Sequence, residues 1–257
     1  MARRARTNPW RVQPDLSERV DAVVFDCYGT LVDVTDTHFI AAFDEICAAN
    51  ALTISGQELW DRWLAEGRRH SEERGRDPRN PLAAPEPPFI PYRETWALWF
   101  ERAFQAMECR GDVAGGSMRM HQLLCDATAY PETLEVLEAL KQRYRVALLS
   151  NADEDHLQIC LEHNGLAFET AISSEGAASY KPHPGIFRRA AELLGVEPTR
   201  MLYVGDSPVA DVVGAHAAGM LVAWVNRTGI ARPEKMPEPD LELRDLRDLL
   251  PALLSKP

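Results

Sequence analysis

The stretch AVVFDCYGTLVD, residues 22–33, decides the fold. It begins as a continuous run of apolar side chains, which is typical of a strand buried on both faces of a parallel sheet. The run stops at the carboxylate of Asp26, and the chain then turns at once through Gly29 and Thr30. A buried strand that ends on a charged group predicts a functional site at that end, because ligands of parallel sheets bind beyond the carboxyl ends of the strands.

Four further apolar runs of this kind follow, and helical patterns separate the later ones. With the first run they are DAVVFD (21–26), RVALLSN (145–151), ETAISSE (169–175), RMLYVGD (200–206) and MLVAWVN (220–226). Strands that alternate with helices are typical of a parallel sheet with helices on its faces. The sequence therefore predicts an α/β protein with five buried strands.

A different pattern fills residues 35–128, where apolar side chains recur at helical spacing and no convincing strand occurs. An all-helical block after the first strand indicates a second domain. We predict a sheet-containing core made of residues 1–34 and 129–257, and an inserted helical domain made of residues 35–128. Within the insert, six prolines between Pro78 and Pro91 predict a long loop. Residues 1 to about 19 are expected to form a polar arm.

Composition limits the possible partners. Of the 257 residues, 46% are hydrophobic, which is enough for a large core without disulfide support. The net charge of -11 argues against a nucleic-acid surface, which needs clustered Lys and Arg, so a small molecule is the expected partner. No apolar segment is long enough to cross a membrane. The five cysteines form no C-x-x-C pair, which predicts a reducing, cytoplasmic location. The oligomeric state stays open.

Polar side chains follow three of the predicted strands. Asp26 ends the first, Ser150 and Asn151 end the second, and Asp206 ends the fourth, while Lys181 lies in the segment YKPHPGIF. Each of these residues alone could be an ordinary turn former or helix cap. Their convergence on one edge of the sheet indicates a functional site instead.

Four segments resemble the motifs of the haloacid dehalogenase (HAD) superfamily: FDCYGTLVD, LLSN, YKPHPGIF and YVGDSPVADVVGA, in the family's order and approximate spacing. The resemblance covers roughly residues 20 to 230. It implies a Rossmann-like core, a helical cap of the C1 type where the insert lies, and a covalent aspartyl intermediate on Asp26.

The resemblance also implies roles for the other residues at the strand ends. It assigns catalysis to Asp26, Tyr28, Ser150 and Lys181. It assigns the binding of a small anionic substrate to Thr30, Ser150, Asn151 and Lys181. It assigns Mg²⁺ coordination to Asp26, Tyr28, Asp206 and Asp211. In the last set, Tyr28 would contribute only its backbone carbonyl.

The sequence is compatible with two reactions of the superfamily, phosphate ester hydrolysis and dehalogenation. Its phosphatases use Mg²⁺, and GDSPVAD, with Asp206 and Asp211 five residues apart, has their form of the fourth motif. The carboxylates near Asp26 would also repel each other by roughly 4 kcal/mol per pair at 4 Å without a cation. The first hypothesis is therefore a Mg²⁺-dependent phosphatase that acts on a small phosphorylated metabolite through an aspartyl-phosphate.

Tyr28 points to the second chemistry. Most phosphatases of the superfamily have a second Asp at this position as a general acid and base, a role that a phenol fills poorly at neutral pH. The pattern D-x-Y-G-T-L is typical of the metal-free 2-haloacid dehalogenases, although Phe187 stands where those enzymes have a tyrosine, and Arg62 is only the nearest candidate for their carboxylate clamp. A haloacid dehalogenase is thus the alternative, and a non-catalytic metabolite-binding module is the third.

Overall fold

The computed structural model describes residues 16–75, 77 and 80–254. Within these residues, six parallel strands form one sheet in the order β3-β2-β1-β4-β5-β6. The strands are β1 (Ala22–Phe25), β2 (Arg145–Ser150), β3 (Thr170–Ser173), β4 (Met201–Gly205), β5 (Leu221–Val225) and β6 (Leu241–Leu243). The five predicted strands are confirmed. The strand β6 was not predicted, because it has only three residues and an exposed Glu242 at its centre.

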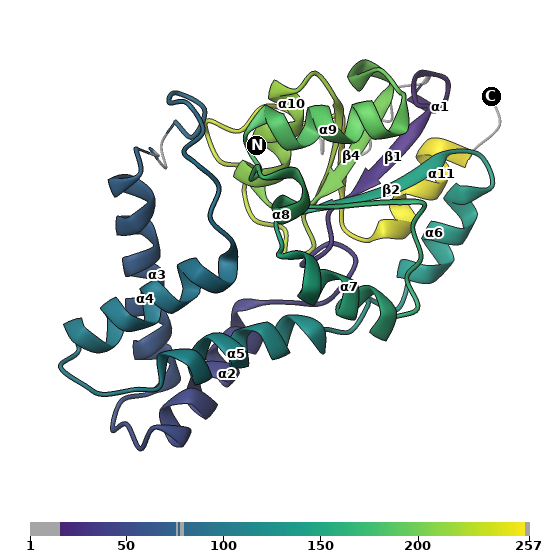
Figure 1. Cartoon of the computed structure of the whole chain (residues 1–257). Coiled ribbons are helices and arrows are strands. Elements are labelled where there is room, and N and C mark those ends of the chain that lie inside the picture. The colour runs from purple at the N-terminus through teal and green to yellow at the C-terminus, as the bar shows by residue number, and fades with distance from the viewer. Residues whose placement is uncertain (1–15, 76, 78–79, 255–257) are drawn as a thin grey trace, which may run out of the picture.

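Helices cover both faces of the sheet (Figure 1). One face packs against α1 (Leu16–Arg19), α6 (Thr133–Lys141), α7 (Glu154–His163) and α11 (Leu249–Leu254). The other packs against α9 (Pro184–Leu194) and α10 (Gly214–Ala217). Strand side chains alternate between these two cores, so that Phe25 faces the first and Val24 the second. The short elements are α8 (Ser174–Ala177), η1 (Pro198–Arg200), η2 (Pro208–Val213) and η3 (Leu246–Asp248).

The start of the described chain corrects one expectation. Residues 16–19 were expected to belong to a polar arm, but they form α1, and Leu16 and Val20 are buried in the core. Two apolar side chains three to four residues apart can anchor one helical turn, a signal too short to recognise in the sequence. The rest of the predicted arm lies outside the described residues.

Residues 35–128, which were predicted to be helical, contain four described helices: α2 (Asp36–Ala49), α3 (Gly56–Glu73), α4 (Tyr92–Ala106) and α5 (Val113–Cys125). They stand to one side of the sheet, and α5 runs beside α7 (Figure 1). Their core is separate and aromatic, with Phe43, Trp63 and Phe100 in mutual contact. The parallel sheet with an inserted helical cap is thus present, and the exact limits 35 and 128 stay a prediction.

The proline-rich segment contacts the sheet-containing core. Pro78 lies outside the described residues, and residues 80–91 contain no helix or strand. Glu86 accepts hydrogen bonds from the Ser179 hydroxyl at 2.9 Å and from the Tyr180 backbone N–H at 2.8 Å. The segment therefore joins the cap to the chain next to Lys181. None of the described helices is long and apolar enough to cross a membrane.

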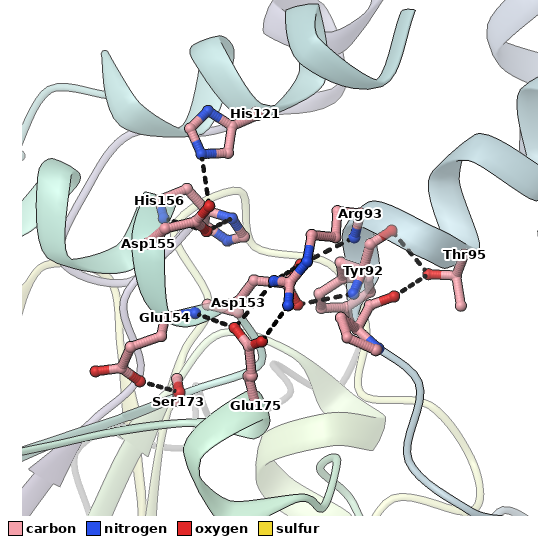
Figure 2. A network of polar contacts seen from close by, with 12 residues as sticks. Tyr92, Arg93, Thr95, His121, Asp153, Glu154, Asp155, His156, Ser173 and Glu175 are labelled. Atoms are coloured by element: carbon pink, nitrogen blue, oxygen red, sulfur yellow. Dashed lines mark hydrogen bonds and ion pairs between the residues drawn. The ribbon is translucent and has the colours of Figure 1, made fainter. Parts of the chain in front are cut away.

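A second contact joins the cap to the core at the start of α4 (Figure 2). The buried carboxylate of Asp153 accepts hydrogen bonds from the backbone N–H groups of Tyr92 and Arg93, at 2.7 and 2.9 Å. The Arg93 guanidinium also pairs with Glu175. A carboxylate at a helix N-terminus satisfies N–H groups that have no partner within the helix, so this contact stabilises both α4 and the position of the cap.

Candidate active site

The carboxyl ends of β1 and β2, with the segment between α8 and α9, bring three of the predicted residues together. Asp26 follows β1 and is 5% exposed. Ser150, the last residue of β2, donates from its hydroxyl to Asp26 Oδ1 at 3.0 Å. Lys181 donates to the same oxygen at 2.6 Å. One carboxylate oxygen of Asp26 is thus firmly held, whereas Oδ2 has only a long contact of 3.5 Å with the Thr30 hydroxyl.

Lys181 is the centre of a buried charge cluster. Its ammonium group donates to Asp26 Oδ1 at 2.6 Å, to Asp211 Oδ1 at 2.6 Å and to the Tyr203 hydroxyl at 2.9 Å. Burial by itself lowers the pKa of Lys181, but the carboxylates of Asp211 and Asp26 outweigh it and raise that pKa above its usual value. All three ammonium protons have an acceptor, which is the condition under which a charge is tolerated in the interior.

Tyr203 is a site residue that the sequence analysis missed. It lies on β4, fully buried, and its hydroxyl donates to the Leu149 carbonyl at 2.9 Å while accepting from Lys181. Burial, together with the charges of Asp211 and Asp26, raises the pKa of this phenol well above 10, so it stays protonated. The available signal was one tyrosine within an otherwise apolar strand, three residues before Asp206.

The segment η2 carries Asp211 back over the end of β4. It winds as a π-helix after Ser207, a form that is common at functional sites. Asp211 Oδ2 accepts from the Ser207 backbone N–H at 2.8 Å, and Oδ1 accepts from Lys181. A side chain on Gly205 would meet the Asp211 carboxylate at 2.4 Å, so glycine is required there for this close approach.

Asn151 holds the backbone of Lys181. Its side-chain carbonyl accepts from the Lys181 N–H at 2.8 Å, and its amide donates to the Lys181 carbonyl at 3.1 Å. The two bonds fix the segment that carries the lysine. In this structure the predicted substrate-binding residue Asn151 therefore positions Lys181, and it also lines the cleft described below.

Asp206 lies close to Asp26, and one carboxylate oxygen of each is within 4.8 Å of the other. Thr30 Oγ1 donates to Asp206 Oδ1 at 3.3 Å, and a side chain on Gly29 would meet Asp206 Oδ2 at 2.6 Å. Gly29 also has a φ of +84°, which favours glycine. Burial, followed by the charges of Asp211 and Asp26, raises the pKa of Asp206 to about 8. This carboxyl group thus exchanges its proton near neutral pH.

The raised pKa of Asp206 predicts a pH-dependent stability. A carboxyl group whose pKa rises on folding from 3.8 to about 8 stabilises the folded state fully below the lower value, and that contribution is lost as pH increases through about 8. With chelator present, we expect the stability of Asp206→Asn relative to wild type to be higher at about pH 9 than at about pH 5, by about 4 kcal/mol. Urea denaturation at both pH values measures it. An equal difference at both would contradict the raised pKa.

Three carboxylates of the site could hold a metal ion. Ligand oxygens of Asp26, Asp206 and Asp211 all lie within 4.8 Å of one another. All-oxygen donors suit a hard cation such as Mg²⁺, and a divalent charge would offset the repulsion among the carboxylates. The donor set therefore fits the predicted metal, although both oxygens of Asp211 already accept hydrogen bonds from the protein.

The side chain of Tyr28 turns away from this group. Its hydroxyl donates to the backbone carbonyl of His156 on α7, at 3.4 Å. Burial, followed by the nearby thiol of Cys27, raises the pKa of Tyr28 far above its usual value. Tyr28 packs against both the sheet core and the cap core. The phenol that was predicted to be catalytic thus has a packing position, and its hydroxyl is not bonded to Asp26.

A cleft between cap and core opens beside Lys181. Its volume is about 180 Å³, and its lining includes His70, Arg74 and Tyr92 from the cap with Asn151 and Lys181 from the core. A cleft of this size admits only a small molecule. The candidate clamp Arg62 is not among its lining residues, and it pairs instead with Glu66 on its own helix, at 2.6 Å.

The site contains a buried carboxylate at the end of β1, with a lysine and a serine bound to one of its oxygens. Two further carboxylates lie nearby. This arrangement is suited to hydrolysis through a nucleophilic carboxylate. The model of the haloacid dehalogenase-like hydrolases matches residues 20–219. The chain belongs to that family of hydrolases.

Proteins similar to this chain include both dehalogenases and phosphatases. Haloacetate dehalogenase H-2 of Moraxella sp. (strain B) is 30% identical over 226 residues, which cover 87% of this chain and 93% of that protein. Phosphoserine phosphatase of Thermus thermophilus is 35% identical over 170 residues, which cover 61% of this chain and 66% of that protein. The crystal structure of an L-2-haloacid dehalogenase shares the fold, with a TM-score of 0.74 and 24% identity over 92% of this chain and 99% of the other.

Proposed function

We propose that this chain is a 2-haloacid dehalogenase, in which Asp26 displaces halide from carbon. This reverses the preference of the sequence analysis for a phosphatase. Relatives that align with most of the chain include haloacetate dehalogenase H-2 and (S)-2-haloacid dehalogenase 4A, the latter 28% identical over 90% of the chain, whereas the phosphoserine phosphatase aligns with 61%. Phosphoglycolate phosphatase of Shigella dysenteriae, 29% identical over 92%, keeps the phosphatase chemistry as a candidate.

The observation that carries the proposal is the position of Tyr28. A phosphatase must protonate the oxygen of its leaving alcohol, and the residue two after the nucleophile is placed to do so. Here that residue is a phenol bonded to the His156 carbonyl, with its pKa raised by burial. A halide leaves without a proton, so displacement at carbon makes no demand on this position.

The first half of the reaction uses the less constrained oxygen of Asp26. Oδ1 is held by Lys181 and Ser150, whereas Oδ2 has only the 3.5 Å contact with Thr30. Oδ2 attacks the halogen-bearing carbon, a carbon–oxygen bond forms, and the halide leaves with the electron pair of the broken carbon–halogen bond. The product of this step is an ester on Asp26.

The second half uses the groups that surround that ester. Water attacks the carboxyl carbon of Asp26, and negative charge develops on Oδ1, where the Lys181 ammonium and the Ser150 hydroxyl already donate at 2.6 and 3.0 Å. In this mechanism Asp206, which has an oxygen within 4.8 Å of one of Asp26 and a pKa of about 8, takes one proton from the water and returns it to the departing hydroxy acid. The bond between the carboxyl carbon and Oδ2 breaks and the hydroxy acid leaves with Oδ2. The second proton of the water is released to solvent, which restores the carboxylate of Asp26.

The substrate carboxylate is assigned to the cap side of the cleft. Arg74 lines the cleft from the cap, as Lys181 does from the core, and its guanidinium donates to the Pro88 carbonyl in the proline-rich segment. An arginine can bind a carboxylate through two parallel hydrogen bonds. Arg74 thus takes the role for which Arg62 was the sequence candidate.

The cluster of three carboxylates at the site favours a second candidate function, that of a Mg²⁺-dependent phosphatase. Asp26, Asp206 and Asp211, with the Tyr28 backbone carbonyl, would hold the ion, which would supply charge neutralisation between the nucleophile and a phosphate. In that case Lys181 and Ser150 keep Oδ1 of Asp26 oriented, and Asp206 is a ligand rather than a base.

One paired assay separates the two functions. Halide release from 2-chloropropionate and phosphate release from p-nitrophenyl phosphate are measured, each with Mg²⁺ and with chelator. We expect halide release that is unchanged by chelator, and phosphate release at least about 100-fold slower in kcat/KM. Phosphate release that requires Mg²⁺, with no halide release, would reverse the order of the candidates.

A further inference from the structure

A second group of metal-binding side chains lies where the cap meets the core (Figure 2). His121 comes from α5 of the cap, while Asp155 and His156 come from the first turn of α7. His121 Nε2 is 3.3 Å from Asp155 Oδ2, and His156 Nδ1 is 3.8 Å from Asp155 Oδ1. One ligand atom from each of the three lies within 4.8 Å of the other two.

His156 is the unexplained member of this group. The residue is 1% exposed, and neither ring nitrogen has a hydrogen-bond partner among the described residues. A buried polar atom without a partner costs about 1–3 kcal/mol, so such atoms are rare unless a water or an ion satisfies them.

The spacing fits a tetrahedral ion. Bonds of about 2.0–2.1 Å from zinc to nitrogen or oxygen place neighbouring ligands about 3.3–3.4 Å apart. The distance from His121 Nε2 to Asp155 Oδ2 has this value. His156 Nδ1 lies 3.8 Å from the other oxygen, Oδ1, so a small rotation of the exposed Asp155 side chain is needed to bring both histidines to one ion. Two imidazoles and one carboxylate favour zinc and similar transition metals, unlike the all-oxygen group at Asp26.

The surroundings give the group an entrance and orient one ligand. The Asp155 side chain is 55% exposed and that of His121 is 25% exposed, so an ion can enter from solvent. Cys125 Sγ lies 3.5 Å from His121 Nδ1, on the same helix. A contact at Nδ1 leaves Nε2, which faces Asp155, as the donor to a metal.

We propose that His121, Asp155 and His156 form a binding site for a zinc-class divalent ion that links the cap to the core. A water completes the four ligands, as in other three-residue sites. Asp153, which holds the start of α4, lies two residues before Asp155 on the same turn of chain. Metal binding therefore stabilises the contact between α5 of the cap and α7 of the core, at a place distinct from Asp26.

Titration of the chelator-treated, dialysed protein with ZnCl₂ by calorimetry tests the proposal. We expect one equivalent to bind to wild type, and Co²⁺ to give the visible absorption of a tetrahedral site without a thiolate charge-transfer band. Affinity should fall by at least about 10-fold in His121→Ala and in Asp155→Asn. Both side chains are partly exposed, so these variants should fold.

Two controls complete the design. His163→Ala removes an exposed histidine from the end of α7 and should bind zinc like wild type. Asp206→Asn alters the other metal-binding group, the one that contains Asp26, and should also bind zinc like wild type. Zinc binding should also raise the melting temperature of wild type and of both controls, but not of His121→Ala. Unchanged zinc affinity in His121→Ala, or no zinc binding by wild type, would overturn the proposal.

Discussion

Replacing Asp26 by Asn should lower kcat/KM by at least about 10⁴-fold, because a neutral amide cannot serve as the carboxylate nucleophile. The substitution keeps the size of the side chain, and Lys181 keeps Asp211 as its ionic partner. The fold should therefore persist, and the melting temperature should stay within a few degrees of wild type. Halide release at saturating and limiting substrate measures the effect.

Asp240→Asn is a matched control for the loss of one carboxylate. Asp240 accepts a hydrogen bond from the Val222 backbone N–H, at the opposite end of β5 from the site. Its replacement should leave kcat/KM within about 3-fold of wild type, because surface changes away from a site have small effects. If Asp26→Asn kept more than a tenth of the wild-type activity, Asp26 would not be the nucleophile.

Replacing Lys181 by Met should damage both stability and catalysis. It leaves Asp26 and Asp211 buried without their shared cation, and breaking a buried pair by removal of one partner costs about 3–5 kcal/mol. It also removes the closest donor to Asp26 Oδ1, and loss of such a donor lowers kcat by about 10²- to 10³-fold. Urea denaturation and steady-state kinetics measure the two effects.

A double variant separates these two roles of Lys181. Lys181→Met with Asp211→Asn also removes one uncompensated charge, so it should recover about half of the lost stability while activity stays low. Met has a similar length to Lys, which limits the cavity that the substitution leaves. Equal stability of the two variants would contradict the charge cluster, and restored activity would contradict the role of Lys181 at Oδ1.

The positions of the main strands could be predicted because a strand buried on both faces has a local signature. DAVVFD and RMLYVGD are continuous apolar runs, and each ends in an acidic residue. A general rule about parallel sheets then places Asp26 and Asp206 on one edge. By contrast, α1 and β6 have too few residues for any period to be recognised, and both depend on contacts with distant parts of the chain.

Contacts between distant residues account for what the sequence analysis missed at the sites. Tyr203 has a role because Lys181, 22 residues earlier, reaches its hydroxyl. His121 and His156 meet only because α5 packs against α7. Tyr28 was visible as an anomaly within the first motif, but the direction of its hydroxyl, toward the His156 carbonyl, depends on the packing of α7. The spacing of residues along the chain cannot predict these contacts.

Single turnover in water labelled with heavy oxygen tests the central claim, that Asp26 attacks carbon and forms an ester, most directly. With enzyme in excess over 2-chloropropionate, water attacks the carboxyl carbon of Asp26, so the peptide that contains Asp26 should gain the label and the hydroxy acid should not. Labelled hydroxy acid together with an unlabelled Asp26 peptide would contradict the account, because water would then have attacked the substrate itself.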